Sequence, residues 1–116
     1  MTQPKPELRK EEGFTYIDNV VVNAKPGIVM RPSVEIKKEC EKYIPRSAYL
    51  VNKAGQDANC LSCTELMLME IQMGKEVTIK VEGEDEKAEK IALRLYSALK
   101  SPNAYELDFD VFEEQD

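Results

Sequence analysis

The sequence predicts a small α/β (α+β) protein, an open-faced two-layer sandwich with three helices on one face of a four-stranded antiparallel or mixed sheet. The apolar residues alternate between strand and helix periodicity along the chain, in the order β-α-β-β-α-β-α. Glycines and prolines punctuate these segments. The length of 116 residues suits one domain with one core.

The four strands are expected where β-branched and aromatic residues cluster between turn signals. The last strand has the clearest pattern, because Val77, Ile79 and Val81 alternate with polar residues and therefore define one buried face. The second and third strands form a hairpin around Gly55. The predicted strands cover residues 15–23, 49–51, 56–60 and 77–81.

The three helices are expected between these strands. The first begins near Arg31-Pro32, since proline is tolerated in a first helical turn, and it ends before Pro45. The second begins at Ser62 with a capping-box pattern, in which Glu65 reaches back to the cap, and it continues to a stop at Gly74. The third ends at Pro102 and has the clearest apolar stripe: Ala88, Ile91, Ala92, Leu95, Ala98 and Leu99.

The net charge of −6 is confined to the C-terminal end. Residues 101–116 contain six acids and no base, so the other 16 of the 22 acids balance the 16 bases. A neutral body gives no bulk electrostatic case for binding nucleic acid or a membrane surface, and we expect neither as a partner. We expect a flexible N-terminal arm at 1–13, a folded domain at 14–101 and an acidic tail at 102–116.

The chain is expected in the reducing cytoplasm. No apolar run approaches the roughly 18–20 residues that cross a bilayer. The N-terminal segment has no secretion-signal pattern, and an odd count of three cysteines argues against a disulfide framework.

The element order and the residues at its junctions resemble the HPr family of the sugar phosphotransferase system. Family members carry a Gly–aliphatic–His–x–Arg–Pro motif before the first helix, and this chain has Gly27-Ile28-Val29-Met30-Arg31-Pro32 in that place. Val29 therefore stands where the family has its phosphoacceptor histidine. A second landmark is the serine that begins the second helix, which a dedicated kinase phosphorylates in some bacterial lineages; here it is Ser62.

This resemblance implies a protein that is not an enzyme and does not carry phosphate on histidine, because the chain contains no histidine. Imidazole supplies the family's nucleophile near neutral pH, and valine has no lone pair to offer. We expect a regulatory docking module without cofactor or metal. Its partners would be proteins, such as phosphotransferase-system proteins, an HPr kinase or a transcription regulator, as for a histidine-lacking paralogue in some Gram-positive bacteria.

For each candidate site residue, a functional role and a purely structural interpretation both stay open. Arg31 binds an anion or a partner's acidic surface, or is simply solvated. Ser62 is a kinase target or only a helix cap. The resemblance places Val34, Cys63 and Met67 in an apolar docking patch, and the alternative is plain core packing.

Two alternatives lie outside that patch. Cys63 is the candidate for a phosphoacceptor other than histidine, although its Cys-x-x-Cys motif with Cys60 is more typical of structural cysteines, and three cysteines without histidine are too few for zinc. In the tail segment from Tyr105 to Glu114, four apolar residues alternate with acids, which predicts an added edge strand or a docking peptide for a partner, or else a disordered end.

Overall fold

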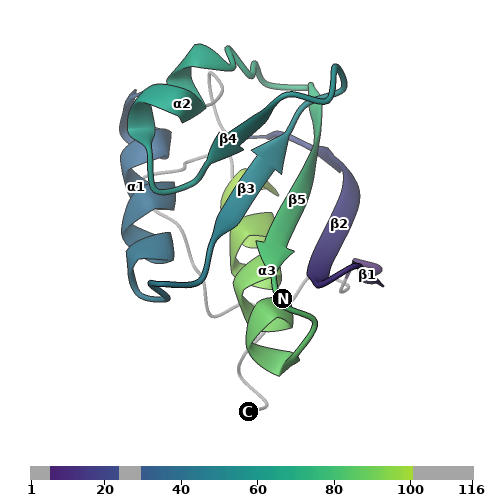
Figure 1. Ribbon diagram of the computed structural model, residues 1–116. Coiled ribbons are helices and arrows are strands. Elements are labelled where there is room, and N and C mark those ends of the chain that lie inside the picture. Colours follow the sequence, from purple (N-terminus) through teal and green to yellow (C-terminus); the bar gives the residue numbers. More distant parts are fainter. Residues whose placement is uncertain (1–5, 24–29, 101–116) are drawn as a thin grey trace, which may run out of the picture.

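A computed structural model describes residues 6–23 and 30–100. Its strands form one sheet in the order β1-β2-β5-β3-β4, in which every neighbouring pair is antiparallel. The helices lie on one side of this sheet (Figure 1). The strands are β1 (Arg9–Glu11), β2 (Phe14–Val21), β3 (Ala48–Val51), β4 (Asp57–Asn59) and β5 (Glu76–Glu82), and the helices are α1 (Met30–Glu41), α2 (Cys63–Leu68) and α3 (Glu86–Lys100).

The core lies between the sheet and α3. Ile79, at the centre of β5, pairs with Ile17 of β2 on one side and with Leu50 of β3 on the other. All three side chains are buried, and all six residues of the predicted α3 stripe are buried beneath them. Because burying one such aliphatic side chain contributes about 1.5–3 kcal/mol, this layer is the main stabilising element of the fold.

The opposite face of the sheet carries aromatic and basic side chains. The guanidinium carbon of Arg9 lies 4.0 Å from the ring centroid of Tyr16, and the ammonium of Lys80 lies 4.4 Å from that of Phe14. In both contacts the cationic group itself lies over the ring, and the ring's quadrupole attracts it. The two-layer, open-faced architecture predicted from the sequence is therefore confirmed.

The sheet has five strands, and the prediction of four was wrong. Arg9–Glu11, which we expected within the loose arm, pair with β2 as β1. The connecting residues Glu12 and Gly13 have φ values of 51° and 89°. Two successive left-handed residues make a tight hairpin turn whose twist matches that of the strands it joins. The domain boundaries proposed from the sequence stay predictions.

The second helix is shorter than predicted. It ends at Leu68 instead of continuing to Gly74, because Glu70 adopts a left-handed φ of 52°. The chain then turns inward and buries Ile71. Met73, which lies within the range predicted for this helix, is consequently outside it and 50% exposed.

Two predicted features lie outside the described residues. One is the motif segment at residues 24–29, which includes Val29, and the other is the tail at 101–116. Within the described part of the chain, no helix combines the length and the apolarity needed to span a bilayer.

Candidate functional site

The candidate site is built on α1 and α2, two helices that contact each other. Cys63 and Met67 are four residues apart and so lie on the same face of α2, while Val34 lies on α1. All three are half-buried, which distinguishes them from the fully buried Leu66 of the same helix. We call these three residues the α1–α2 surface. They combine apolar character with partial exposure, as a docking patch requires.

Two further predicted site residues, Val29 and Arg31, lie in sequence just before α1 and in its first turn. The backbone of Arg31 is in the first turn of this helix, and its side chain is outside what the structure describes. Val29 precedes the helix in the undescribed segment 24–29. The anion-binding role of Arg31 stays a prediction.

Ser62 is the N-cap of α2, as predicted. Its backbone is extended, with φ −118° and ψ 105°, and its hydroxyl oxygen accepts a hydrogen bond from the backbone N–H of Glu65 at 3.1 Å. This bond satisfies one of the donors that a helix start leaves without a partner. The hydroxyl group is therefore fixed at the edge of the α1–α2 surface, in a half-buried position.

The carboxylate of Glu65 departs from the predicted capping box. Instead of accepting from the N–H of Ser62, it accepts from the backbone N–H of Asn59 at 2.9 Å. The N–H of Ser62 donates to the carbonyl oxygen of Asn59 at 2.9 Å, so that donor is already satisfied by the loop. The side chain of Glu65 thereby joins the first turn of α2 to the end of the edge strand β4.

The three cysteines have different environments. Cys60 is fully buried, and its hydrogen bond with Cys40, together with burial, raises the pKa of the Cys60 thiol. Cys40 is buried as well, whereas Cys63 is half-buried. The thiol partner of Cys60 is therefore Cys40 of α1 and not Cys63 of its own motif, and no disulfide joins them. Cys60 packs as an apolar side chain. Among the described residues, no group of three or more potential ligands is arranged to hold a metal ion.

A group of polar side chains around one buried carboxylate joins α1 to α3. Glu39 of α1 is 2% exposed and accepts hydrogen bonds from Lys42 at 2.8 Å and from the hydroxyl of Tyr43 at 2.9 Å. Its carboxylate also lies 3.4 Å from the guanidinium of Arg94 on α3. Sequence reasoning missed this cluster. The available signal was position, because Glu39 falls three residues after Ile36, on the apolar face of the helix.

Three comparisons relate this geometry to known proteins. A family model described as the PTS HPr component phosphorylation site matches residues 17–98. The phosphocarrier protein HPr of Bacillus anthracis superposes with a TM-score of 0.60 at 25% identity, over 73% of this chain and 98% of that one. No curated protein sequence matches.

Two further solved structures share the fold at lower identity. A histidine-containing phosphocarrier protein of Mycoplasma has a TM-score of 0.56 at 24% identity, over 66% of this chain and 85% of that one. The protein HPr-C-His of Thermoanaerobacter tengcongensis has a TM-score of 0.57 at 20% identity, over 75% and 93%.

The sheet order, the paired helices and these similarities define a small protein of the phosphocarrier type. The chain belongs to the HPr family of the phosphotransferase system, as the family match over residues 17–98 shows.

Proposed function

We propose that this chain is a regulatory docking module of the phosphotransferase system that does not transfer phosphate on histidine. The observation that carries the proposal is the absence of histidine from all 116 residues. The HPr-family position of the phosphoacceptor holds Val29, a hydrocarbon side chain that cannot attack phosphorus. A cytoplasmic location is part of this proposal.

Partner binding is assigned to the α1–α2 surface. Val34, Cys63 and Met67 are apolar and half-buried, so a partner would remove their remaining exposed area from water. Methionine adapts its shape to different partners because it is unbranched and flexible. Enzyme I, an HPr kinase and a transcription regulator are the partners that family membership favours.

Regulation is assigned to Ser62. A kinase would transfer the γ-phosphoryl group of ATP to its hydroxyl oxygen, with release of ADP and the hydroxyl proton. The added group carries about −1.5 to −2 charges at neutral pH. The N–H of Glu65, now 3.1 Å from the hydroxyl oxygen, would favour this charge, and the carboxylate of Glu65 would oppose it. The modification would therefore change the charge at the border of the α1–α2 surface.

The test is phosphorylation of the purified full chain, read by intact mass and site mapping. One sample contains Enzyme I with phosphoenolpyruvate, and another contains HPr kinase with ATP. We expect one phosphate on Ser62 from the kinase alone, and none in a Ser62→Ala variant.

Two other outcomes would contradict the expected phosphorylation of Ser62 by the kinase alone. Phosphate on Cys63 in the Enzyme I sample would favour the alternative of a non-histidine carrier, and a Cys63→Ser variant would then lose it. No modification in either sample would overturn regulation by phosphate and leave docking alone.

A further inference from the structure

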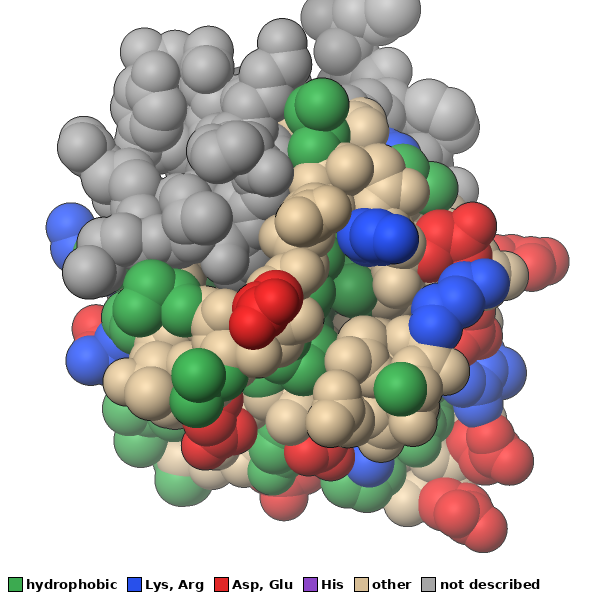
Figure 2. Space-filling view, turned by 90° about the horizontal axis from the view of Figure 1, so that it is seen from above, with side chains coloured by type: hydrophobic (Ala, Val, Ile, Leu, Met, Phe, Trp, Pro, Cys, Tyr) green, Lys and Arg blue, Asp and Glu red, His purple; other side chains and the backbone are tan. Residues whose placement is uncertain are grey.

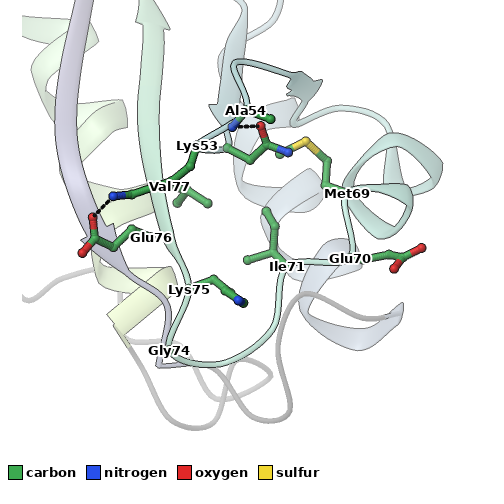
Figure 3. Close-up of a pocket in the computed structure, with 10 residues that line it drawn as sticks. Lys53, Ala54, Met69, Glu70, Ile71, Gly74, Lys75, Glu76 and Val77 are labelled. Atoms are coloured by element: carbon green, nitrogen blue, oxygen red, sulfur yellow. Dashed lines mark hydrogen bonds and ion pairs between the residues drawn. The ribbon is translucent and has the colours of Figure 1, made fainter.

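A pocket of about 450 Å³ lies at the end of the molecule that Figure 2 presents, outside the α1–α2 surface. Three segments line it: the β3–β4 turn at 52–54, the residues after α2 at 69–71, and the start of β5 at 74–77. Figure 3 shows Ile71 and Met69 directed toward its centre, while the carboxylate of Glu70 points away. The pocket is therefore mainly apolar inside.

Exposed hydrophobic residues are next in sequence to residues that line this pocket. Three large hydrophobic residues of the described part of the chain are exposed, and two of them adjoin lining residues in sequence. Leu68, at 73% exposure, precedes Met69, and Met73, at 50%, precedes Gly74. An apolar pocket with an apolar border is the kind of surface that binds a peptide through alternate side chains.

Basic charge lies at the edge of the pocket. Lys53 pairs with Glu76 at 3.3 Å, so these two charges largely compensate each other. Lys75, by contrast, forms no ion pair with a carboxylate of the described residues, and its side chain is exposed. Figure 2 shows a hollow floored by hydrophobic side chains with basic side chains along one border. The occupant should therefore combine apolar with acidic residues.

The end of α3 lies beside this same edge. The carbonyl oxygen of Leu99 accepts from the N–H of Asn23 at 2.8 Å. The neighbouring Val22 donates to the carbonyl oxygen of Lys75 at 2.9 Å and accepts from the N–H of Gly74 at 2.7 Å. One short segment thus separates the last helical turn from two residues that line the pocket.

The chain that follows this helix has the composition that the pocket requires. Residues 101–116 contain six acids and no base, and apolar residues alternate with acids from Tyr105 to Val111. In an extended conformation this alternation puts the apolar side chains on one face. Tyr105 is five residues beyond Lys100, a reach of up to about 18 Å at 3.3–3.6 Å per residue.

We propose that residues 105–112 bind in this pocket of their own chain, with apolar side chains inside and acids near Lys75. The short tether raises the effective concentration of the tail to about the millimolar range, which favours it over a free peptide of the same sequence. The tail then covers the exposed side chains of Leu68, the last residue of α2, and of Met73, five residues further along the chain. Ser62 is at the opposite end of this helix.

Tryptophan fluorescence of the full chain tests this proposal, because the chain contains no tryptophan of its own. In a Phe109→Trp variant we expect blue-shifted emission and several-fold weaker acrylamide quenching than in a peptide of residues 101–116 with the same substitution. Adding Lys75→Glu and Met73→Gln should raise the quenching to that of the peptide. Both positions are exposed, so the fold should tolerate these changes.

Two matched controls separate binding from general effects. Lys87→Glu makes the same charge change on an exposed part of α3, and Ile44→Gln removes an exposed apolar side chain distant in sequence from the pocket lining. Neither should alter quenching. The proposal is overturned if the full chain is quenched like the peptide, or if the controls act as strongly as the pocket variants. Protection that rises with protein concentration would instead assign the pocket to the tail of a second copy.

Discussion

The carboxylate of Glu65 accepts a hydrogen bond from the backbone N–H of Asn59 at 2.9 Å and so connects the first turn of α2 to the end of β4. The backbone N–H of the same glutamate donates to the hydroxyl oxygen of Ser62. One residue therefore supports both the edge strand and the proposed phosphorylation site. A change in charge at Ser62 should therefore alter the strength of the hydrogen bond that attaches α2 to the end of β4.

Loss of the cap at Ser62 should destabilise the protein moderately. We expect Ser62→Ala to lower the free energy of unfolding by about 1 kcal/mol, because the N–H of Glu65 loses its acceptor. Urea unfolding followed by circular dichroism measures this. Thr64→Ala, on the exposed side of the same helix, should change stability by less than about 0.5 kcal/mol. Equal effects of the two substitutions would contradict the capping role.

A negative charge at position 62 should interact unfavourably with Glu65. We expect Ser62→Asp to be more costly in the parent chain than in a Glu65→Gln background, with a coupling of about 0.5 kcal/mol. The glutamine oxygen can still accept from Asn59, so the attachment to β4 is kept. A double-mutant cycle in urea gives the coupling. A coupling free energy of zero would mean that the two side chains do not interact.

The buried carboxylate of Glu39 should be among the costliest polar groups to remove. We expect Glu39→Ala to lower the free energy of unfolding by about 3 kcal/mol, since Arg94 of α3 loses an ionic partner and Tyr43 an acceptor. Tyr43→Phe should cost about 1 kcal/mol. Glu41→Ala, at an exposed position in the same helix, serves as the control. If Glu41→Ala and Glu39→Ala are alike, the cluster does not hold α1 to α3.

Gly83 should tolerate a side chain less well than Gly55. Both have left-handed φ values, 104° and 85°, so alanine at either position costs about 1–2 kcal/mol of backbone strain. At Gly83 the new Cβ would also lie 2.6 Å from Nη1 of Arg46, while nothing lies within 4 Å at Gly55. The Tm of Gly83→Ala should therefore be the lower of the two. The reverse order would show that Arg46 moves aside without loss.

Acid should weaken the start of α3 through Asp85. Hydrogen bonds from Arg46 and then from the backbone N–H of Ala88 hold the pKa of Asp85 at about 2, below its usual 3.8. Because the folded-state pKa is depressed, this stabilisation is present above the usual pKa and is lost as pH falls toward the folded value. We expect Tm to fall between about pH 5 and about pH 2, and to fall less in Asp85→Asn. An equal pH dependence of Tm in the parent chain and in Asp85→Asn would contradict this role of Asp85.

Thiol labelling should distinguish Cys63 from the other two cysteines. In the native protein we expect a thiol reagent to modify Cys63 alone, because Cys40 and Cys60 are buried and the pKa of Cys60 is raised. In denaturant all three thiols should react. A Cys63→Ser variant should show no native labelling. Rapid modification of Cys60 in the native state would contradict the burial of the Cys40–Cys60 pair.

Most of the fold could be predicted because its signals are local. The alternation of Val77, Ile79 and Val81 and the apolar stripe of α3 each arise from one element whose buried face repeats regularly. The two failures have non-local causes. β1 forms because the edge of β2 that does not pair with β5 is available for hydrogen bonding. α2 ends early because the chain turns after Leu68 and buries Ile71 in the core.

The candidate site was predictable only in part. Ser62 was found because a helix cap has a short-range pattern, whereas the partner of the Glu65 carboxylate was not, because Asn59 belongs to another element. The contact between Cys60 and Cys40 has the same explanation, since nineteen residues of chain lie between them.

The sequence by itself determined the order of the elements from β2 to α3, the absence of histidine and the confinement of net negative charge to the tail, because composition and periodicity need no knowledge of contacts. Only the tertiary structure decided which polar groups are buried together, as in the cluster of Glu39, Tyr43 and Arg94. It also placed the last turn of α3 beside Val22 and Gly74, next to an apolar pocket. Such neighbours are set by how the layers pack, and no local pattern encodes a contact between residues so far apart in the chain.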